Sequence, residues 1–367
     1  MRPVLSVVDL FAGVGGFSEG FLRVNRTEKK FQFALKLLVD SDPTASFTFK
    51  KNYPRIPFWN ADIAKLKAEE LLKLLRMRRG ELDILIGGPP CQGFSTLGKQ
   101  DQEDERNSLW RYYADTIVRA KPKYFVVENV AAFARSSQFQ DFLEATSRGG
   151  LLENYGFECD ILNAADFGAF QARKRTVIIG YHRDLGFPGF PDPTHVGRHR
   201  TVGDAFREID VDPDGIDLPN GDEVAFAGKT FAGPFTSREL HLGRNYRPLS
   251  LARFAKIPAG GNRFNIPDEL LADCWKKHTS GSGDVMGRLR EDKPSVTIRT
   301  EFFKPEKGRY LHPSADRAIT HFEAAVLQGF PHDHKFVGSK TAIARQIGNA
   351  VPIPLGRAIG KALARRF

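Results

Sequence analysis

The sequence predicts an α/β fold, with a doubly wound, mostly parallel sheet interrupted by a smaller irregular domain. In the first half of the chain, β-branched and apolar runs alternate with segments of helical periodicity. Strands that alternate with helices in this way usually form parallel sheets. From about residue 186 to about residue 300 the chain is rich in Gly, Pro and charged residues, and a regular apolar period returns only at residue 318.

The first strand covers residues 4–11 and breaks at a glycine turn, from which a helix begins near Phe17. A second strand covers residues 34–39 and ends at Asp40. Asp62 can cap a helix that runs to Arg79. The same patterns predict a strand at 82–86, a helix after Asn107, strands at 124–127 and 176–181, and helices at 318–327 and 354–364.

Composition restricts the class of protein. A chain of 367 residues can bury one substantial core and a second, smaller one. No apolar run approaches the roughly 20 residues that span a bilayer. The three cysteines, Cys91, Cys159 and Cys274, are far apart and form no C-x-x-C pair. We therefore expect a cytoplasmic protein with no disulfide framework and no bound metal.

Residues 87–95, with the sequence GGPPCQGFS, follow a buried strand and present a cysteine. Gly admits positive φ and Pro fixes φ, so this segment forms an irregular loop. It starts at the carboxyl end of a strand, where open α/β sheets bind their ligands. Most single cysteines are small buried apolar residues. Here the rigid proline pair before Cys91 and the small polar residues after it favour an accessible thiol.

The glycine turn at residues 11–16, FAGVGG, is close to a dinucleotide-binding fingerprint, but Ser18 occupies the position of the third glycine. Asp40 ends the next strand and is placed to accept hydrogen bonds from ribose hydroxyls. The two features together fit an adenosine-bearing cofactor, with or without a pyrophosphate. The alternative is a turn that needs glycine for its backbone conformation alone.

Charged residues flank two further strands. Glu128 lies at the mouth of a strand and can face the Cys91 loop, the alternative being a surface acid. Arg173 and Arg175 precede another core strand at a spacing that places them on the same side. Two guanidiniums there would favour a thiolate and bind a phosphate or a base carbonyl. The alternative is a solvated basic run.

Five motifs occur in one order: DLFAGVGG at 9–16, GPPCQGFS at 88–95, ENV at 128–130, QARKR at 171–175 and QIGNAVP at 346–352. PSVTI at 294–298 adds a weaker match. This pattern closely resembles the DNA (cytosine-5) methyltransferases. The resemblance covers about the first 185 and the last 50 residues.

The resemblance implies methyl transfer from S-adenosylmethionine to C5 of a cytosine in double-stranded DNA, on a Rossmann-like fold, with S-adenosylhomocysteine as product. It implies that Cys91 attacks C6 of a flipped-out base, that Glu128 contacts N3, and that Arg173 and Arg175 hold O2 and a phosphate. Ser41 departs from the family, which often has a bulky apolar residue there. The implied cofactor contacts are Phe11, Ala12, Gly13, Gly15, Gly16, Asp40, Ser41, Asp62, Ile63, Pro89, Leu109, Asn349 and Ala350.

The resemblance also implies two domains, a discontinuous catalytic domain at residues 1–185 and 320–367 and a target recognition domain at 186–319. The net charge is +10, which permits a polyanionic partner. Residues 190–240 carry 5 basic and 10 acidic side chains, whereas residues 241–310 carry 14 and 8. Most basic side chains there should bind phosphates. The candidate DNA contacts are Gln92, Ser95, Arg244, Arg247, Arg253, Lys256, Arg263, Lys276 and Lys277.

We expect a monomeric prokaryotic enzyme associated with the nucleoid through DNA, the modification half of a restriction system whose partner nuclease acts on the same site. The main alternative is a tRNA cytosine-5 methyltransferase of the same family. A catalytically silent DNA-binding protein has no need of the Cys91, Glu128 and Arg173 set. A dehydrogenase is disfavoured by Ser18 and leaves the Pro-Pro-Cys loop unexplained.

Overall fold

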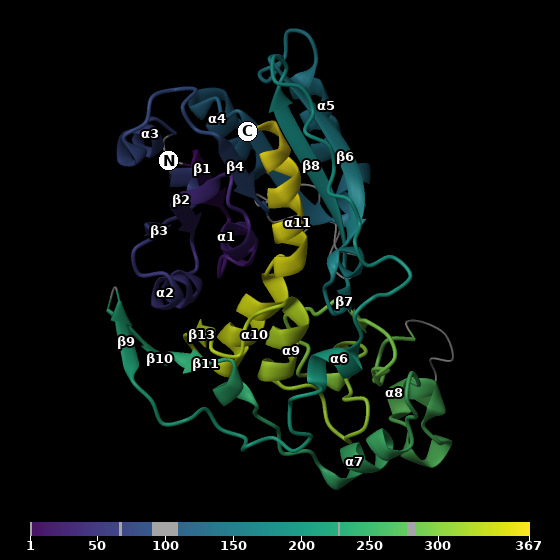
Figure 1. The fold of residues 1–367 in the computed structure, drawn as a ribbon. Coiled ribbons are helices and arrows are strands. Elements are labelled where there is room, and N and C mark those ends of the chain that lie inside the picture. Colours follow the sequence, from purple (N-terminus) through teal and green to yellow (C-terminus); the bar gives the residue numbers. More distant parts are fainter. Residues whose placement is uncertain (1, 66–67, 90–108, 227, 277–282) are drawn as a thin grey trace. The chain divides into compact units, whose positions relative to one another are not determined.

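The computed structural model describes residues 2–65, 68–89, 109–226, 228–276 and 283–367. By packing, the chain divides into two compact units (Figure 1). Unit 1 comprises Met1–Phe167, Lys174–Thr194 and Ala350–Phe367, and unit 2 comprises Gly168–Arg173 and His195–Asn349. Within the described ranges, no helix has the length and apolar character needed to cross a membrane.

Unit 1 is built on a sheet whose seven described strands lie in the order β3-β2-β1-β4-β5-β8-β6. All neighbouring pairs are parallel except those of β8, which runs antiparallel to both β5 and β6. The predicted doubly wound, mostly parallel sheet is therefore confirmed. The strands are β1 (Val4–Leu10), β2 (Gln32–Asp40), β3 (Phe58–Asn60), β4 (Ile84–Gly87), β5 (Tyr124–Val130), β6 (Tyr155–Asn163) and β8 (Lys174–His182).

The helices of unit 1 connect these strands, and the last helix of the chain lies beside the first. The C-terminal helix α11 packs along α1 (Figure 1). The approach is so close that a Cβ built on Gly20 would lie 2.5 Å from the backbone of Gly356. The helices are α1 (Gly16–Thr27), α2 (Pro43–Asn52), α3 (Ala68–Leu75), α4 (Leu109–Ala120), α5 (Ser137–Thr146) and α11 (Ile353–Leu363).

The helix predicted to run to Arg79 is shorter in the structure. Asp62 accepts a hydrogen bond from the Ala64 N–H at the start of a short 3₁₀ turn, and α3 then ends at Leu75. Arg76 adopts a left-handed conformation with φ of 51°, and Met77 donates its N–H back to the Leu72 carbonyl. This backbone reversal ends the helix although leucines continue the apolar period up to it.

Unit 2 contains short elements, and one of its apolar clusters consists of Phe254, Ile257, Ile266, Met286 and Leu311. Its strands pair two by two, β9 with β10, β11 with β13 and β7 with β12. They are β7 (Gln171–Ala172), β9 (Glu223–Phe226), β10 (Lys229–Ala232), β11 (Phe235–Thr236), β12 (Ser295–Val296) and β13 (Lys335–Phe336). The helices are α6 (Val202–Phe206), α7 (Pro248–Ala255), α8 (Asp273–Lys276), α9 (His321–Gln328) and α10 (Lys340–Asn349).

Packing and the predicted domain limits divide the chain differently. Residues 320–349 and 168–173, which we assigned to the catalytic domain, pack within unit 2, and residues 186–194 pack within unit 1. The assignment of residues 1–185 and 320–367 to catalysis and of residues 186–319 to target recognition concerns function and stays a prediction.

Candidate functional site

The glycine turn between β1 and α1 is tied to the end of β2. The Gly13 N–H donates to Asp40 Oδ2 at 2.8 Å, and the Asp42 N–H donates to Asp40 Oδ1 at 2.8 Å. Gly13 and Gly15 have φ of 53° and 78°, which favours glycine. A Cβ on Gly15 would collide with the ring of Phe49. One carboxylate thus orders the loops that follow both strands.

This corner of unit 1 fits the cofactor that the resemblance implies. A Cβ built on Gly13 would meet no atom of the described residues within 4 Å, so within that part of the chain the turn faces open space. Asp40 is partly exposed, and burial raises the pKa of its carboxyl group while the N–H donors oppose that shift. A carboxylate accepts up to about four hydrogen bonds, so Asp40 can still accept from ribose hydroxyls. Phe11 is half-buried beside the turn, whereas Ser41 and Asp62 are exposed.

Ser18 has a structural partner that sequence reasoning missed. Its hydroxyl donates to Oδ2 of the buried Asp9 at 2.6 Å, which ties α1 to the end of β1. Burial raises the pKa of Asp9 to about 7, and the nearby charge of Asp40 adds to the shift. The first residue of the DLFAGVGG motif is therefore a structural acid beneath the turn.

Because the pKa of Asp9 is raised, we expect the free energy of unfolding to depend on pH. Between about pH 4 and pH 7 the native Asp9 holds a proton that the unfolded chain has lost, so its contribution to stability falls as pH rises. Asp9→Asn keeps an acceptor for Ser18 and cannot titrate. We expect the free energy of unfolding of wild type minus that of the variant to fall by up to about 1.4 kcal/mol per pH unit in this range. Urea unfolding at several pH values measures it, and a constant difference would contradict the prediction.

The start of the cysteine loop lies against β5. Glu128 is 8% exposed, and its Oε1 pairs with Arg175 Nε on β8 at 3.0 Å. A Cβ built on Gly88 would lie 3.3 Å from Glu128 Oε2, so the second carboxylate oxygen faces the loop backbone. Asn129 Nδ2 donates to the Pro89 carbonyl at 2.9 Å. Sequence reasoning missed this role for Asn129, although its place beside Glu128 in the ENV motif was the available signal.

The structure therefore brings Glu128 and Arg175 to the segment that leads into Cys91. Burial lowers the pKa of Arg175, and the charge of Glu128 opposes that shift. Cys91 itself, with Gln92 and Ser95, lies outside the described residues.

Arg173 has different partners from Arg175. It is 5% exposed, and its Nη1 donates to the carbonyls of Ile298 at 2.9 Å and Gly348 at 3.1 Å. Among the other cofactor candidates, Ile63, Pro89 and Ala350 are buried, Leu109 is half-buried at the start of α4, and Asn349 is exposed at the end of α10.

The basic candidates of unit 2 divide by exposure. Arg244, Arg247, Lys256 and Lys276 are exposed, and Arg253 is half-buried with its Nε on the Leu270 carbonyl at 2.6 Å. Arg263 is only 7% exposed, and its guanidinium lies 4.4 Å from the ring centre of Phe264. Lys277 lies outside the described residues. The exposed members are therefore the better candidates for phosphate contacts.

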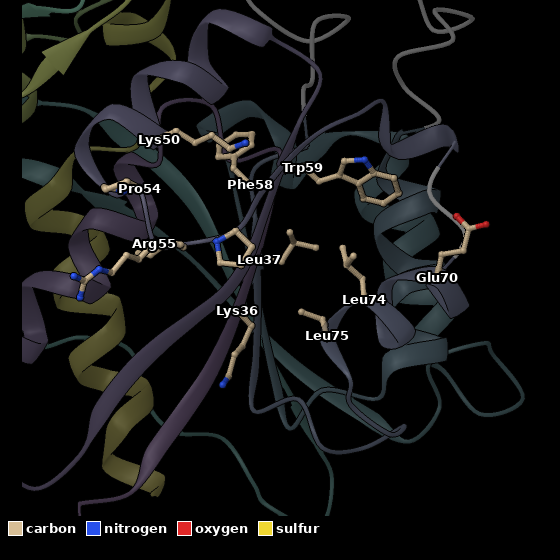
Figure 2. Close-up of a pocket in the computed structure, with 12 residues that line it drawn as sticks. Lys36, Leu37, Lys50, Pro54, Arg55, Phe58, Trp59, Glu70, Leu74 and Leu75 are labelled. Atoms are coloured by element: carbon tan, nitrogen blue, oxygen red, sulfur yellow. The ribbon is translucent and has the colours of Figure 1, made fainter. Parts of the chain in front are cut away.

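A pocket of about 710 Å³ lies elsewhere in unit 1 (Figure 2). Lys36 and Leu37 of β2, Phe58 and Trp59 of β3, and Leu74 and Leu75 of α3 line it with their neighbours. Every predicted cofactor residue lies outside this lining. The pocket is therefore not the corner formed by the glycine turn and Asp40.

Comparisons with known proteins agree with the motifs. The family model for C-5 cytosine-specific DNA methylases matches residues 5–365. Type II methyltransferase M1.HphI of Haemophilus parahaemolyticus is 34% identical over 98% of this chain and 87% of its own. Type II methyltransferase M.XorII of Xanthomonas oryzae is 33% identical over 98% and 84%.

Solved structures show the same fold. A prophage-encoded protein of Escherichia coli superposes with a TM-score of 0.72 at 25% identity over 98% of each chain. DNMT2 of Spodoptera frugiperda has a TM-score of 0.60 at 16% identity over 98% of this chain and 99% of its own, which shows the fold alone. With its motifs, its sheet and a family model that spans nearly its whole length, the chain belongs to the C-5 cytosine-specific DNA methylase family.

Proposed function

We propose that this member of the DNA cytosine-5 methyltransferases uses Cys91 as its nucleophile, Glu128 at N3 of the target base and S-adenosylmethionine as methyl donor. The observation that carries the assignment is the ion pair of Glu128 and Arg175, held at 3.0 Å beside Gly88 and Pro89. The buried carboxylate and guanidinium thus lie beside the two residues that precede residues 90–108, a range that includes Cys91.

The chemistry explains why these groups are needed. C5 of cytosine is too weak a nucleophile to take a methyl group directly, so the Cys91 thiolate first forms a bond to C6. Glu128 hydrogen-bonds or protonates N3 so that negative charge does not accumulate on the ring. Arg175 orients the Glu128 carboxylate and can bind the O2 carbonyl. After methylation a base takes the C5 proton, and the electrons of that bond expel the thiolate.

The target base must leave the duplex, because C6 is inaccessible inside the stack. Flipping costs a few kcal/mol. Contacts from the basic part of unit 2 offset that cost, with Arg244, Arg247, Lys256 and Lys276 as the exposed candidates.

The glycine turn would hold the methyl donor, which supplies an activated methyl group on a sulfonium. Asp40 would accept hydrogen bonds from its ribose, and the side of Gly13 that meets no described atom would leave room for it. Phe11, half-buried beside the turn, would pack against its adenine.

Relatives at 30–34% identity are named as Type II methyltransferases or a Type II methylase, which favours DNA over tRNA as the substrate. We propose that the chain is the modification enzyme of a prokaryotic restriction system, acting as a monomer in the cytoplasm on the site that a cognate nuclease cuts.

Labelled S-adenosylmethionine distinguishes the two substrates. We expect incorporation of the methyl group into unmethylated duplex DNA and none into tRNA. Label in tRNA alone would refute the DNA assignment. Bisulfite sequencing of a naive genome that expresses the chain then identifies the recognised site and the modified cytosine.

A further inference from the structure

Three buried side chains in unit 2 hold the end of α10. Gln171 and Arg173 come from the QARKR motif, and Gln328 is the last residue of α9. Gln171 and Gln328 are fully buried and Arg173 is nearly so. We refer to Gln171, Arg173 and Gln328 as the α10 clamp.

The hydrogen bonds of the clamp join segments that are far apart in the sequence. Gln171 accepts the Ile298 N–H at 3.1 Å and donates to Gln328 Oε1 at 2.8 Å. Gln328 donates to the Ile347 carbonyl at 2.6 Å, and Arg173 donates to the Gly348 carbonyl at 3.1 Å. The QARKR, PSVTI and QIGNAVP motifs therefore share one buried network.

The acceptors on α10 are the groups that a helix leaves unpaired. The last four carbonyls of an α-helix have no partner within the helix, and a positive charge there is favourable. Ile347 and Gly348 belong to that last turn, because α10 ends at Asn349. The clamp thus satisfies two carbonyls at the C-terminus of α10.

The residues that follow reach the glycine turn. Ala350 is the second residue after Gly348 and starts the return of the chain to unit 1. Within unit 1, a Cβ on Gly16 would lie 3.1 Å from the Ala350 Cβ and 2.6 Å from the Val351 carbonyl oxygen. Two peptide units therefore join the end of α10 to residues that, within unit 1, pack against the turn that is proposed to bind the cofactor.

We propose that Arg173, with Gln171 and Gln328, is a positioning residue for the cofactor site and does not contact the target cytosine. The inference rests on the proposed function, because it assumes that the glycine turn binds S-adenosylmethionine. It differs from the role that the resemblance implies for Arg173, since the guanidinium Nη1 is occupied by the carbonyls of Ile298 and Gly348.

Two variants test the proposal. Arg173→Lys keeps the charge but loses the planar donor geometry, and Gln328→Met keeps the volume but cannot donate to Ile347. We expect each to raise the Kd for S-adenosylhomocysteine, measured by calorimetry without DNA, by about five- to tenfold. The KM for S-adenosylmethionine should rise in parallel, while kcat and the KM for DNA stay within about twofold of wild type.

Arg288→Lys is the matched control. Arg288 is also a buried arginine of unit 2, and it donates to the backbone carbonyls of Phe254, Ile257, His312 and Ala315, outside the clamp. This variant should lose thermal stability and keep the wild-type Kd for S-adenosylhomocysteine. Circular dichroism identifies a variant that fails to fold. If Arg173→Lys does not fold, the Kd of Gln328→Met tests the proposal in its place.

Three results would overturn the proposal: an unchanged Kd in Gln328→Met, a raised Kd in the Arg288→Lys control, or a fall in kcat or DNA affinity without a change in Kd in Arg173→Lys. The last result would indicate that Arg173 contacts the substrate, as the resemblance implies. If the wild-type protein did not bind S-adenosylhomocysteine at all, the proposed cofactor would be wrong, which is a separate outcome.

Discussion

We expect the replacement of Cys91 by serine to abolish methyl transfer and to leave DNA binding intact. A serine hydroxyl is not ionised near neutral pH and is a far weaker nucleophile than a thiolate, so addition to C6 fails. We expect the rate of methyl transfer to fall by roughly a thousandfold or more. The Kd for duplex DNA should stay near that of wild type, because the side chains differ by one atom. Transfer of labelled methyl groups and a gel-shift titration measure the two quantities.

Cys159→Ser is the control for this variant. Cys159 is half-buried on β6, and burial raises the pKa of its thiol to about 11, so it is protonated at neutral pH and cannot replace Cys91 as nucleophile. The control should keep full activity. DNA with fluorine at C5 of the target cytosine should form a stable adduct with Cys159→Ser and none with Cys91→Ser. With fluorine at C5 there is no proton for the base to remove, so the thiolate cannot be expelled after methyl transfer. Methyl transfer above a trace by Cys91→Ser would show that Cys91 is not the nucleophile.

The strands around the candidate site could be predicted because local patterns decide them. β1, β4 and β5 are short apolar runs that are buried on both faces, and each ends at a polar or glycine-rich motif. Their parallel pairing follows from the alternation of strands and helices, whereas the order in which β1 lies between β2 and β4 was not predicted. β6, at the edge of the sheet, was not predicted, although Phe157, Cys159 and Ile161 alternate with Glu158 and Asp160 in its sequence.

The partners of each site residue could not be predicted, because they are set by contacts between distant segments. The spacing of Arg173 and Arg175 suggests one shared role, yet one donates to the carbonyls of Ile298 and Gly348 and the other pairs with Glu128. The basic surroundings of Arg263 predict a surface cation, but in the structure Arg263 is buried and its guanidinium lies over the ring of Phe264. Charge patterns locate a basic region, whereas the exposure of each member depends on tertiary packing.

Glu128→Gln should lower kcat by about a hundredfold to ten-thousandfold, the usual contribution of a positioned proton donor. The amide fits the same space and can accept a hydrogen bond from Arg175, but it cannot give a proton to N3 as the thiolate adds. The Kd values for DNA and for S-adenosylhomocysteine should change little. Single-turnover methylation at saturating DNA and cofactor measures the chemical step directly.

Loss of a buried ion pair also lowers stability, so a matched variant must separate stability from chemistry. Asp83→Asn supplies it, because Asp83 is also 8% exposed and pairs with a cation, Lys123 Nζ at 2.7 Å. Asp83 precedes β4 and therefore lies at the opposite end of the parallel strands from Glu128. Both variants should unfold at lower urea concentration, and only Glu128→Gln should lose kcat. Equal losses of kcat in the two variants would mean that Glu128 acts through stability and not on the base.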